Sequence, residues 1–187
     1  MMKKKAKTIA IMGVDGSGKS TAVELLKNKY GSRCSVIYMG NTRFEDPRID
    51  RLKSRRFSRP LILLLIYRCY WKRYVKGLYQ SELAIFDRYV HEIFINAGKG
   101  WYNRINAFLY KYCFPKPNII VYLYCPAEES LRRKSDIPDS DVFVALKKRF
   151  DDYFLKNKQI LCLNSSQLSP ADITEQISNF INHSLGI

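Results

Sequence analysis

The chain has 187 residues, enough for one domain with a substantial buried core, and its 47% hydrophobic and 26% charged residues exclude an intrinsically disordered chain. Five scattered cysteines without C-x-x-C spacing argue against a disulfide framework or a zinc site and favour a reducing, cytoplasmic location. A formal net charge of +15 points to an anionic partner.

Short apolar runs alternate with segments of helical periodicity, which predicts an α/β domain built on a parallel sheet. No repeat or linker interrupts the pattern, so residues 1–187 are expected to form a single domain. The expected strands are Thr8–Met12, Ser35–Met39, Leu83–Phe86, Ile119–Tyr124 and Ile160–Leu163. The expected helices include Ser20–Tyr30, with Gly31 as its C-terminal cap, Arg59–Tyr79, Asp141–Asn157 and Pro170–Ser184.

The loop between the first strand and the first helix has the pattern G-x-x-x-x-G-K-[ST], which binds phosphate in strand–loop–helix settings. Its glycines let successive backbone N–H groups turn toward phosphate oxygens. Lys19 can reach the β- and γ-phosphates, and the hydroxyl of Ser20 can ligate Mg²⁺. The predicted ATP-binding residues are Gly13, Asp15, Gly16, Ser17, Gly18, Lys19, Ser20 and Thr21.

The segment Arg48–Lys76 carries ten Lys or Arg residues against one acid, Asp50. It would suit a nucleotide, nucleic acid or lipid headgroups, and a solvated helix face explains it equally well. No nucleic-acid-binding module accompanies it, so nucleic acid is not the expected partner. The apolar run Leu61–Tyr67 is far shorter than the roughly 20 residues of a transmembrane helix, so at most a weak contact with a membrane surface is expected.

The third expected strand runs directly into Asp87, Arg88 and Tyr89. Ligands of parallel sheets gather at the carboxyl ends of the strands. Asp87 there can hold Mg²⁺ or orient an acceptor group, and Arg88 can bind a second phosphate through two parallel hydrogen bonds. The alternative is a strand-end Asp that caps the next helix, beside a surface Arg.

The motifs "GVDGSGKST" and, some seventy residues later, "FDRY" resemble those of the thymidylate kinase family of P-loop nucleoside monophosphate kinases. Downstream, "IIVYLYCPAEESLRRK" resembles that family's fourth strand and the helix that introduces its lid, and "LKKRFDDYF" and "ILCLNSS" resemble the helix and strand after the lid. The resemblance implies a P-loop fold with a five-stranded parallel sheet in the order 2-3-1-4-5, flanked by helices, and a short lid at about 132–141. It also implies ATP and Mg²⁺ as cofactors and a homodimer.

The resemblance also implies roles for single residues. Asp15 would face the sugar of the acceptor and Arg88 its phosphate, while Arg43 and Arg68 would be further arginines on the acceptor side. Metal binding falls to Ser20 and Asp87, and Lys134 joins the lid cations. The implied catalytic residues are Lys19, Asp87, Arg88, Arg132 and Arg133, the last two as lid cations that neutralise charge on the transferring phosphoryl group.

The chain departs from the family where the acceptor base is selected. It reads "MGNTRFEDP" without the family's Glu-Pro, "VHEIFINAGKGWYN" after Asp-Arg-Tyr, and a short acidic lid, "SDIPDSD". We expect transfer of the γ-phosphoryl group of ATP to a nucleoside monophosphate, with dTMP favoured. The alternatives are a kinase of a sugar or lipid-linked acceptor and a nucleotide-binding module without catalysis.

Overall fold

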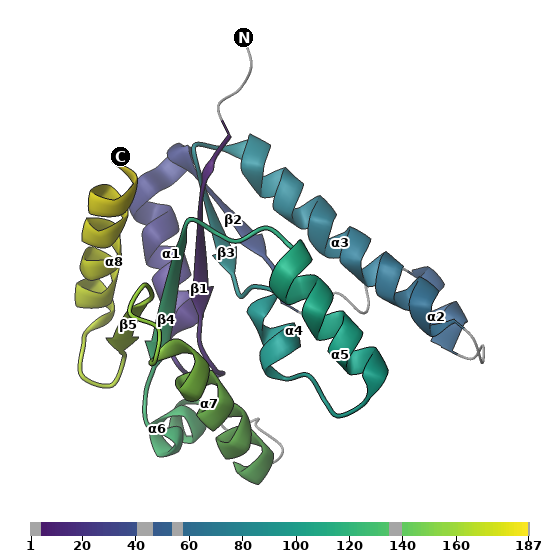
Figure 1. Cartoon of the computed structure of the whole chain (residues 1–187). Helices are drawn as coiled ribbons and strands as arrows, with labels where there is room; N and C mark the ends of the chain where they lie inside the picture. The colour runs from purple at the N-terminus through teal and green to yellow at the C-terminus, as the bar shows by residue number, and fades with distance from the viewer. Residues whose placement is uncertain (1–4, 41–46, 54–57, 135–139, 187) are drawn as a thin grey trace.

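The computed structural model describes residues 5–40, 47–53, 58–134 and 140–186. Within these residues a five-stranded parallel sheet has the order β2-β3-β1-β4-β5, which confirms the expected topology. Figure 1 shows the strands at the centre of the molecule, between two layers of helices. The strands are β1 Lys7–Met12, β2 Cys34–Tyr38, β3 Leu83–Asp87, β4 Ile119–Tyr124 and β5 Leu161–Asn164.

The central strand β1 is buried on both faces because helices cover the sheet on each side. Its residues Ile9 and Ile11 face one core, and Ala10 and Met12 face the other. The register pairs Ile11 with Asp87 of β3. The carboxyl ends of neighbouring strands therefore meet at one edge of the sheet, where the loop after β1 begins.

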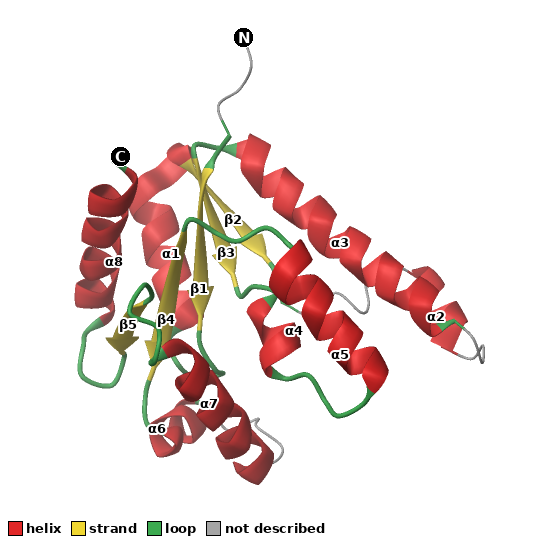
Figure 2. Ribbon diagram, viewed as in Figure 1, coloured by secondary structure: helices red, strands yellow, loops and turns green. Residues whose placement is uncertain are grey.

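One layer consists of α1 (Lys19–Tyr30) and α8 (Pro170–Leu185), which lie side by side (Figures 1 and 2). Their apolar faces share a core with one face of the sheet, through residues such as Leu26 and Ile177. The helix α8 begins with a capping box in which Ser169 and Asp172 exchange side-chain-to-backbone hydrogen bonds. This start agrees with the expected one.

The opposite layer covers the other face of the sheet and holds the second core, which is rich in aromatic residues. Its longest element is α3 (Arg59–Gln80). This helix packs closely on β3 because Gly77 has no side chain: a Cβ there would lie 2.9 Å from the ring of Phe86. The layer consists of α2 (Pro47–Lys53), α3 (Arg59–Gln80), α4 (His91–Ile95), α5 (Trp101–Phe108), a π-helical turn η2 (Leu109–Cys113), α6 (Ala127–Arg133) and α7 (Ser140–Phe154).

The expected strands and long helices are confirmed with boundaries shifted by up to three residues. Gly31 caps α1 as expected, with φ 54° and its N–H donating to the carbonyl of Lys27. The elements α2, α4 and α5 were not expected. They span seven, five and eight residues, and segments this short show little more than two turns of helical periodicity.

The basic segment lies mostly on α2 and α3. Leu63, Leu65 and Tyr70 of α3 are buried, whereas Arg68 and Lys72 are exposed, as expected of a solvated helix face. Within the described part of the chain, no helix combines the length and the apolarity that crossing a bilayer requires.

Candidate functional site

The loop between β1 and α1 passes so close to neighbouring backbone that glycine is required at two positions. Gly13 has φ 155°, and a Cβ there would lie 2.5 Å from the carbonyl oxygen of Leu123 in β4. Gly16 has φ 78°, and a Cβ there would lie 2.5 Å from the carbonyl oxygen of Ser130 in α6. The loop is therefore held against the end of β4 and against α6 by contacts that only glycine permits.

Lys19 is the first residue of α1, and its side chain folds back over the loop. Its ammonium group donates a hydrogen bond to the carbonyl of Val14, with Nζ 2.5 Å from the oxygen. Burial, reinforced by the positive charge of Arg88, lowers the pKa of Lys19 to about 8. An anion bound in this loop would supply the negative charge that favours the protonated lysine.

The end of β3 places Asp87 and Arg88 beside the loop. The carbonyl of Asp87 accepts a hydrogen bond from the N–H of Met39 at 2.8 Å, and the N–H of Arg88 donates to the carbonyl of Ile11 at 3.1 Å. Arg88 has φ 67°, which is uncommon for a residue with a side chain and is held here by backbone bonds to the strands on both sides. The direction of the Arg88 side chain is thus set by the sheet.

Arg88 lies between two carboxylates, because its guanidinium forms ion pairs with Asp15 and, at 2.7 Å, with Glu92 of α4. Lys134 approaches Asp15 from α6, with Nζ 3.5 Å from Oδ2. Burial alone would raise the pKa of Asp15, but the charges of Arg88 and Lys19 lower it below its usual value. Burial raises the pKa of Glu92 and outweighs the opposing effect of Arg88.

These groups enclose a first cavity of about 400 Å³ at the carboxyl edge of the sheet. It brings together most of the residues expected to bind ATP and metal, with Tyr38 and Lys134 in addition. Gly13 and Ser17 are buried within the loop and do not line it. The lining residues are Asp15, Gly16, Gly18, Lys19, Ser20, Thr21, Tyr38, Asp87, Arg88, Arg133 and Lys134.

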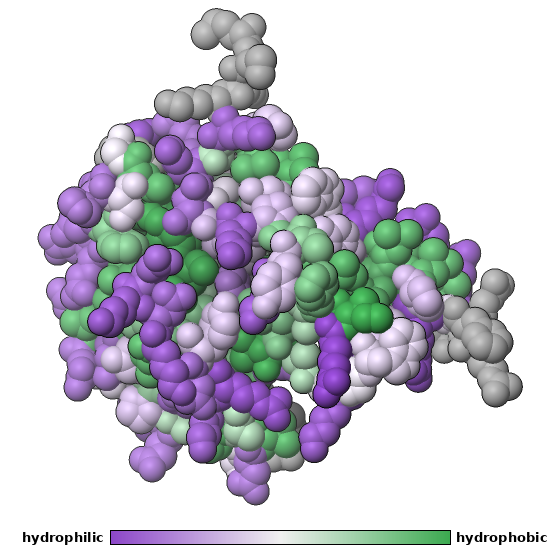
Figure 3. All heavy atoms as spheres, viewed as in Figure 1, coloured by the Kyte–Doolittle hydropathy of each residue, from purple (hydrophilic) through white to green (hydrophobic). Residues whose placement is uncertain are grey.

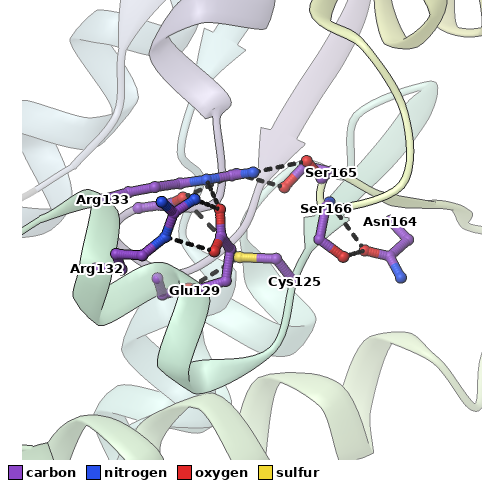
Figure 4. Close-up of polar contacts among 9 residues, drawn as sticks. Cys125, Glu129, Arg132, Arg133, Asn164, Ser165 and Ser166 are labelled. Atoms are coloured by element: carbon purple, nitrogen blue, oxygen red, sulfur yellow. Dashed lines mark hydrogen bonds and ion pairs between the residues drawn. The ribbon is translucent and has the colours of Figure 1, made fainter.

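Two arginines at the end of α6, expected to act together, are placed differently (Figure 4). Arg133 donates to the carbonyl of Ser165 at 3.0 Å and to its hydroxyl at 3.2 Å, and it also lies 3.5 Å from the carbonyl oxygen of Gly16. It therefore joins the loop to the segment after β5. Arg132 is 76% exposed and pairs with Glu129 on the same helix. The lid residues 135–139 lie outside the described residues.

A second cavity of about 400 Å³ lies between α3, α4 and α5, and sequence reasoning did not find it. Glu92 lines it and is joined to the first cavity through Arg88. In the described structure, the buried Oδ1 of Asn106 and the buried hydroxyl of Tyr110 have no hydrogen-bond partner. The lining residues are Ile66, Tyr70, Glu92, Ile93, Asn96, Ala97, Gly98, Asn103, Asn106 and Tyr110.

Of the two remaining arginines expected on the acceptor side, the structure describes one. Arg68 is exposed on α3 and lines neither cavity, and Arg43 lies outside the described residues. Arg73, which was not singled out, donates to the carbonyl of Gly40 at 3.3 Å and lies over the ring of Tyr38. It therefore approaches the carboxyl end of β2, beside the first cavity.

The donors in the first cavity fit a Mg²⁺ ion bound together with a phosphorylated ligand. Ser20 offers a hydroxyl oxygen and Asp87 a carboxylate, and Mg²⁺ prefers oxygen ligands. The described residues contain no cluster of three His, Cys, Asp or Glu side chains arranged to hold a metal. Phosphate oxygens and water would thus complete the coordination, as is usual for Mg²⁺ at nucleotide sites.

Comparisons with known proteins agree on one class of relatives. No family model matches the chain. A probable thymidylate kinase of Saccharolobus solfataricus is 27% identical over 136 residues, which cover 68% of this chain and 69% of that protein. The structure of thymidylate kinase from Candida albicans matches with a TM-score of 0.68 and 21% identity over 96% of this chain and 92% of that one. Deoxyadenosine kinase from M. mycoides, solved with bound dATP, matches with a TM-score of 0.61 and 19% identity over 94% of this chain and 99% of that one.

Proposed function

We propose that the chain, a distant homologue of thymidylate kinases with the fold of P-loop kinases, transfers the γ-phosphoryl group of ATP to a nucleoside monophosphate, with dTMP as the favoured acceptor. One observation carries the proposal. Arg88 lines the first cavity and is ion-paired to Glu92, which lines the second. The first cavity, suited to phosphate, therefore adjoins a separate polar pocket at this ion pair.

The first cavity would hold the phosphates of ATP. Backbone N–H groups of the glycine loop and the N-terminus of α1 favour an anion there, and the ammonium of Lys19 is already placed over the loop. Ser20 and Asp87 would hold Mg²⁺, which neutralises phosphate charge. Arg133, fixed between Gly16 and Ser165, would border the nucleotide on the side of β5.

The second cavity would hold the acceptor base. The aliphatic side chains of Ile66 and Ile93 suit the faces of a flat ring, and the amides of Asn103 and Asn106 suit the polar edge of a base. The unpartnered Oδ1 of Asn106 is the group that a ring N–H or amino group would satisfy. A nucleoside accounts for both kinds of lining in one ligand.

The reaction needs few groups besides those that position its partners. An acceptor oxygen forms a bond to the γ-phosphorus, the bond to the β-phosphate oxygen breaks, and ADP leaves. Lys19 and Arg88 would stabilise charge on the phosphoryl oxygens, while Asp87 would orient the acceptor side. Burial raises the pKa of Asp87, which brings this carboxylate closer to accepting a proton near neutrality.

A second candidate acceptor is a nucleoside without a phosphate. Arg88, the residue proposed to bind the acceptor phosphate, already pairs with Asp15 and Glu92. A phosphate dianion would have to displace one of these carboxylates, whereas the hydroxyl of a nucleoside could hydrogen-bond to one of them. The structural match to a deoxyadenosine kinase supports keeping this candidate.

The experiment is a coupled ADP-release screen over deoxynucleoside monophosphates, the matching nucleosides and a panel of sugars, with the Lys19→Ala variant as the blank. Acceptor-dependent ADP formation with dTMP supports the leading proposal. Activity with nucleosides alone selects the second candidate. Turnover with sugars, or ATP binding without turnover on any acceptor, would overturn both.

A further inference from the structure

We infer that α5 and the turn η2 form a docking surface for an anionic lipid bilayer, separate from both cavities of the kinase site. The surface consists of four exposed apolar or aromatic side chains with arginine and lysine side chains beside them. It does not depend on the proposed acceptor, and its test does not use kinase activity.

The apolar part is a stripe on one side of a single helical segment. Trp101, Ile105, Phe108 and Tyr112 follow one another at spacings of four, three and four residues, which places them on one face. Their relative exposures are 69%, 46%, 57% and 63%. Side chains of this size are normally the ones a helix buries, so this helix turns its apolar face outward.

The other face of the same helix is polar and is turned toward the rest of the protein. Asn103 and Asn106 line the second cavity, and the hydroxyl of Tyr102 donates to the carbonyl of Arg59 at the start of α3, at 2.8 Å. The helix is therefore anchored through its polar face. The apolar stripe is left without a covering element in the described structure, and Figure 3 shows hydrophobic side chains on the surface in the region of α5 and α3.

Cations flank the stripe. A shallow groove of about 630 Å³ between α5, η2 and α7 is lined by Phe108 and Tyr112 together with Arg104, Lys111 and Arg149. None of these three cations forms an ion pair with a described residue, and Asp152, the carboxylate in the groove, pairs with Lys156 at 2.9 Å. Residues 97–118 contain four Lys or Arg and no Asp or Glu.

An anionic bilayer fits this combination better than a second copy of the chain. Aromatic and aliphatic side chains on one helix face enter the interface between headgroups and acyl chains, while adjacent cations attract anionic lipids. A twofold interface through the same surface would bring the three cations of both copies, Arg104, Lys111 and Arg149, into one interface, where like charges repel. A membrane supplies the opposite charge along the whole stripe.

The test uses the two tryptophans of the chain, Trp71 and Trp101. In the Trp71→Phe variant, the fluorescence reports on Trp101 alone. We expect a blue shift and quenching by brominated acyl chains on adding phosphatidylcholine vesicles that contain 30% phosphatidylserine. Binding should weaken as salt is raised and should be absent with pure phosphatidylcholine. No shift with anionic vesicles, or equal binding to neutral ones, would overturn the inference.

Matched variants distinguish the loss of this docking surface from a general effect of an added charge or of misfolding. Ile105→Asp should abolish vesicle binding, whereas Val144→Asp, at a position on α7 that is also 46% exposed, should leave it intact. Lys111→Gln should weaken binding about fivefold, as expected for one cation near an anionic surface. If Ile105→Asp instead converts a dimer to a monomer while vesicles have no effect, the surface is a subunit interface and the inference is wrong.

Discussion

Arg88 and Glu92 form an ion pair, with Nη1 2.7 Å from Oε1, across the boundary between the two cavities. Arg88, directly after β3, faces the glycine loop and the first cavity, and Glu92, on α4, faces the second cavity. Burial raises the pKa of Glu92, and the positive charge of Arg88 opposes that rise. A ligand in the first cavity that recruits Arg88 would take away the cation that pairs with Glu92 in the second.

Replacing Lys19 with alanine should abolish turnover and leave the fold intact. The ammonium is buried and pays a desolvation cost, so its removal should not lower the free energy of unfolding. We expect a loss of at least about a hundredfold in kcat, the magnitude seen when a preorganised charge is removed. Lys29→Ala, in the last turn of the same helix, is the control and should retain activity. Retained turnover in Lys19→Ala would refute the assignment of the loop.

ATP affinity should fall as the pH rises above about 8. The pKa of Lys19 is lowered to about 8 in the ligand-free protein, and bound phosphates favour the charged form, so binding is accompanied by proton uptake above that pH. Below about pH 7 the lysine is protonated before binding and this dependence disappears. Calorimetry at pH 9 in buffers of different ionisation enthalpy measures the uptake. Equal affinity at pH 7 and pH 9.5 would show that Lys19 does not contact the phosphates.

Asp15→Asn should raise the KM for the acceptor while ATP affinity holds. The side chain of Asp15 points to Arg88 and Lys134 and lies on the acceptor side of the loop, whereas phosphates are bound by backbone N–H groups. Loss of this carboxylate leaves Arg88 with one partner and removes an acceptor for a ligand hydroxyl. Separate titrations of ATP and acceptor distinguish the two sites. A defect in ATP binding alone would contradict this placement.

Arg132 and Arg133 should give different phenotypes. Arg133 holds the loop to the segment after β5, so Arg133→Ala should raise the KM for ATP and lower thermal stability. Arg132 pairs on its own helix and is 76% exposed, which leaves it able to swing toward a bound phosphoryl group. Arg132→Ala should lower kcat with little change in either KM or stability. Steady-state kinetics and melting curves of both variants, with Lys148→Ala as a surface control, decide the question.

Asn106→Leu should weaken acceptor binding without destabilising the protein. The Oδ1 of Asn106 is buried and unpartnered in the described structure, so an apolar side chain of similar volume removes a desolvation penalty. The same change removes a hydrogen-bonding group from the second cavity, and we expect the acceptor KM to rise about tenfold. Unchanged acceptor KM would show that the base does not occupy this cavity.

The parts of the site that sequence predicted are those built from local pattern. The loop from Gly13 to Ser20 and the strand that ends at Asp87 each carry their signal within a few residues, and the parallel sheet brings them together. The second cavity depends on how α3, α4 and α5 pack, and Ile66 and Asn106 are forty residues apart. No local pattern predicts that these two residues line one cavity.

Arg68 shows that a difference of two positions along a helix decides which face a side chain occupies. Each residue turns a helix by about 100°, so two residues separate nearly opposite faces. Tyr70 lines the second cavity, while Arg68 faces solvent. The helix α5 was not predicted for a different reason: it spans eight residues, a short window in which to recognise the helical spacing of its apolar side chains.

The positive φ of Arg88 sets backbone strain against the contacts of its side chain at one position. A glycine there would adopt φ 67° without strain, and it would relieve about 1 kcal/mol or more that the arginine stores in the backbone. Loss of the guanidinium would also leave Asp15 and Glu92 without their partner, so the ion pairs of Arg88 oppose the gain from relieving this strain. We therefore expect glycine or asparagine at this position only in relatives in which the role proposed for Arg88 has been lost.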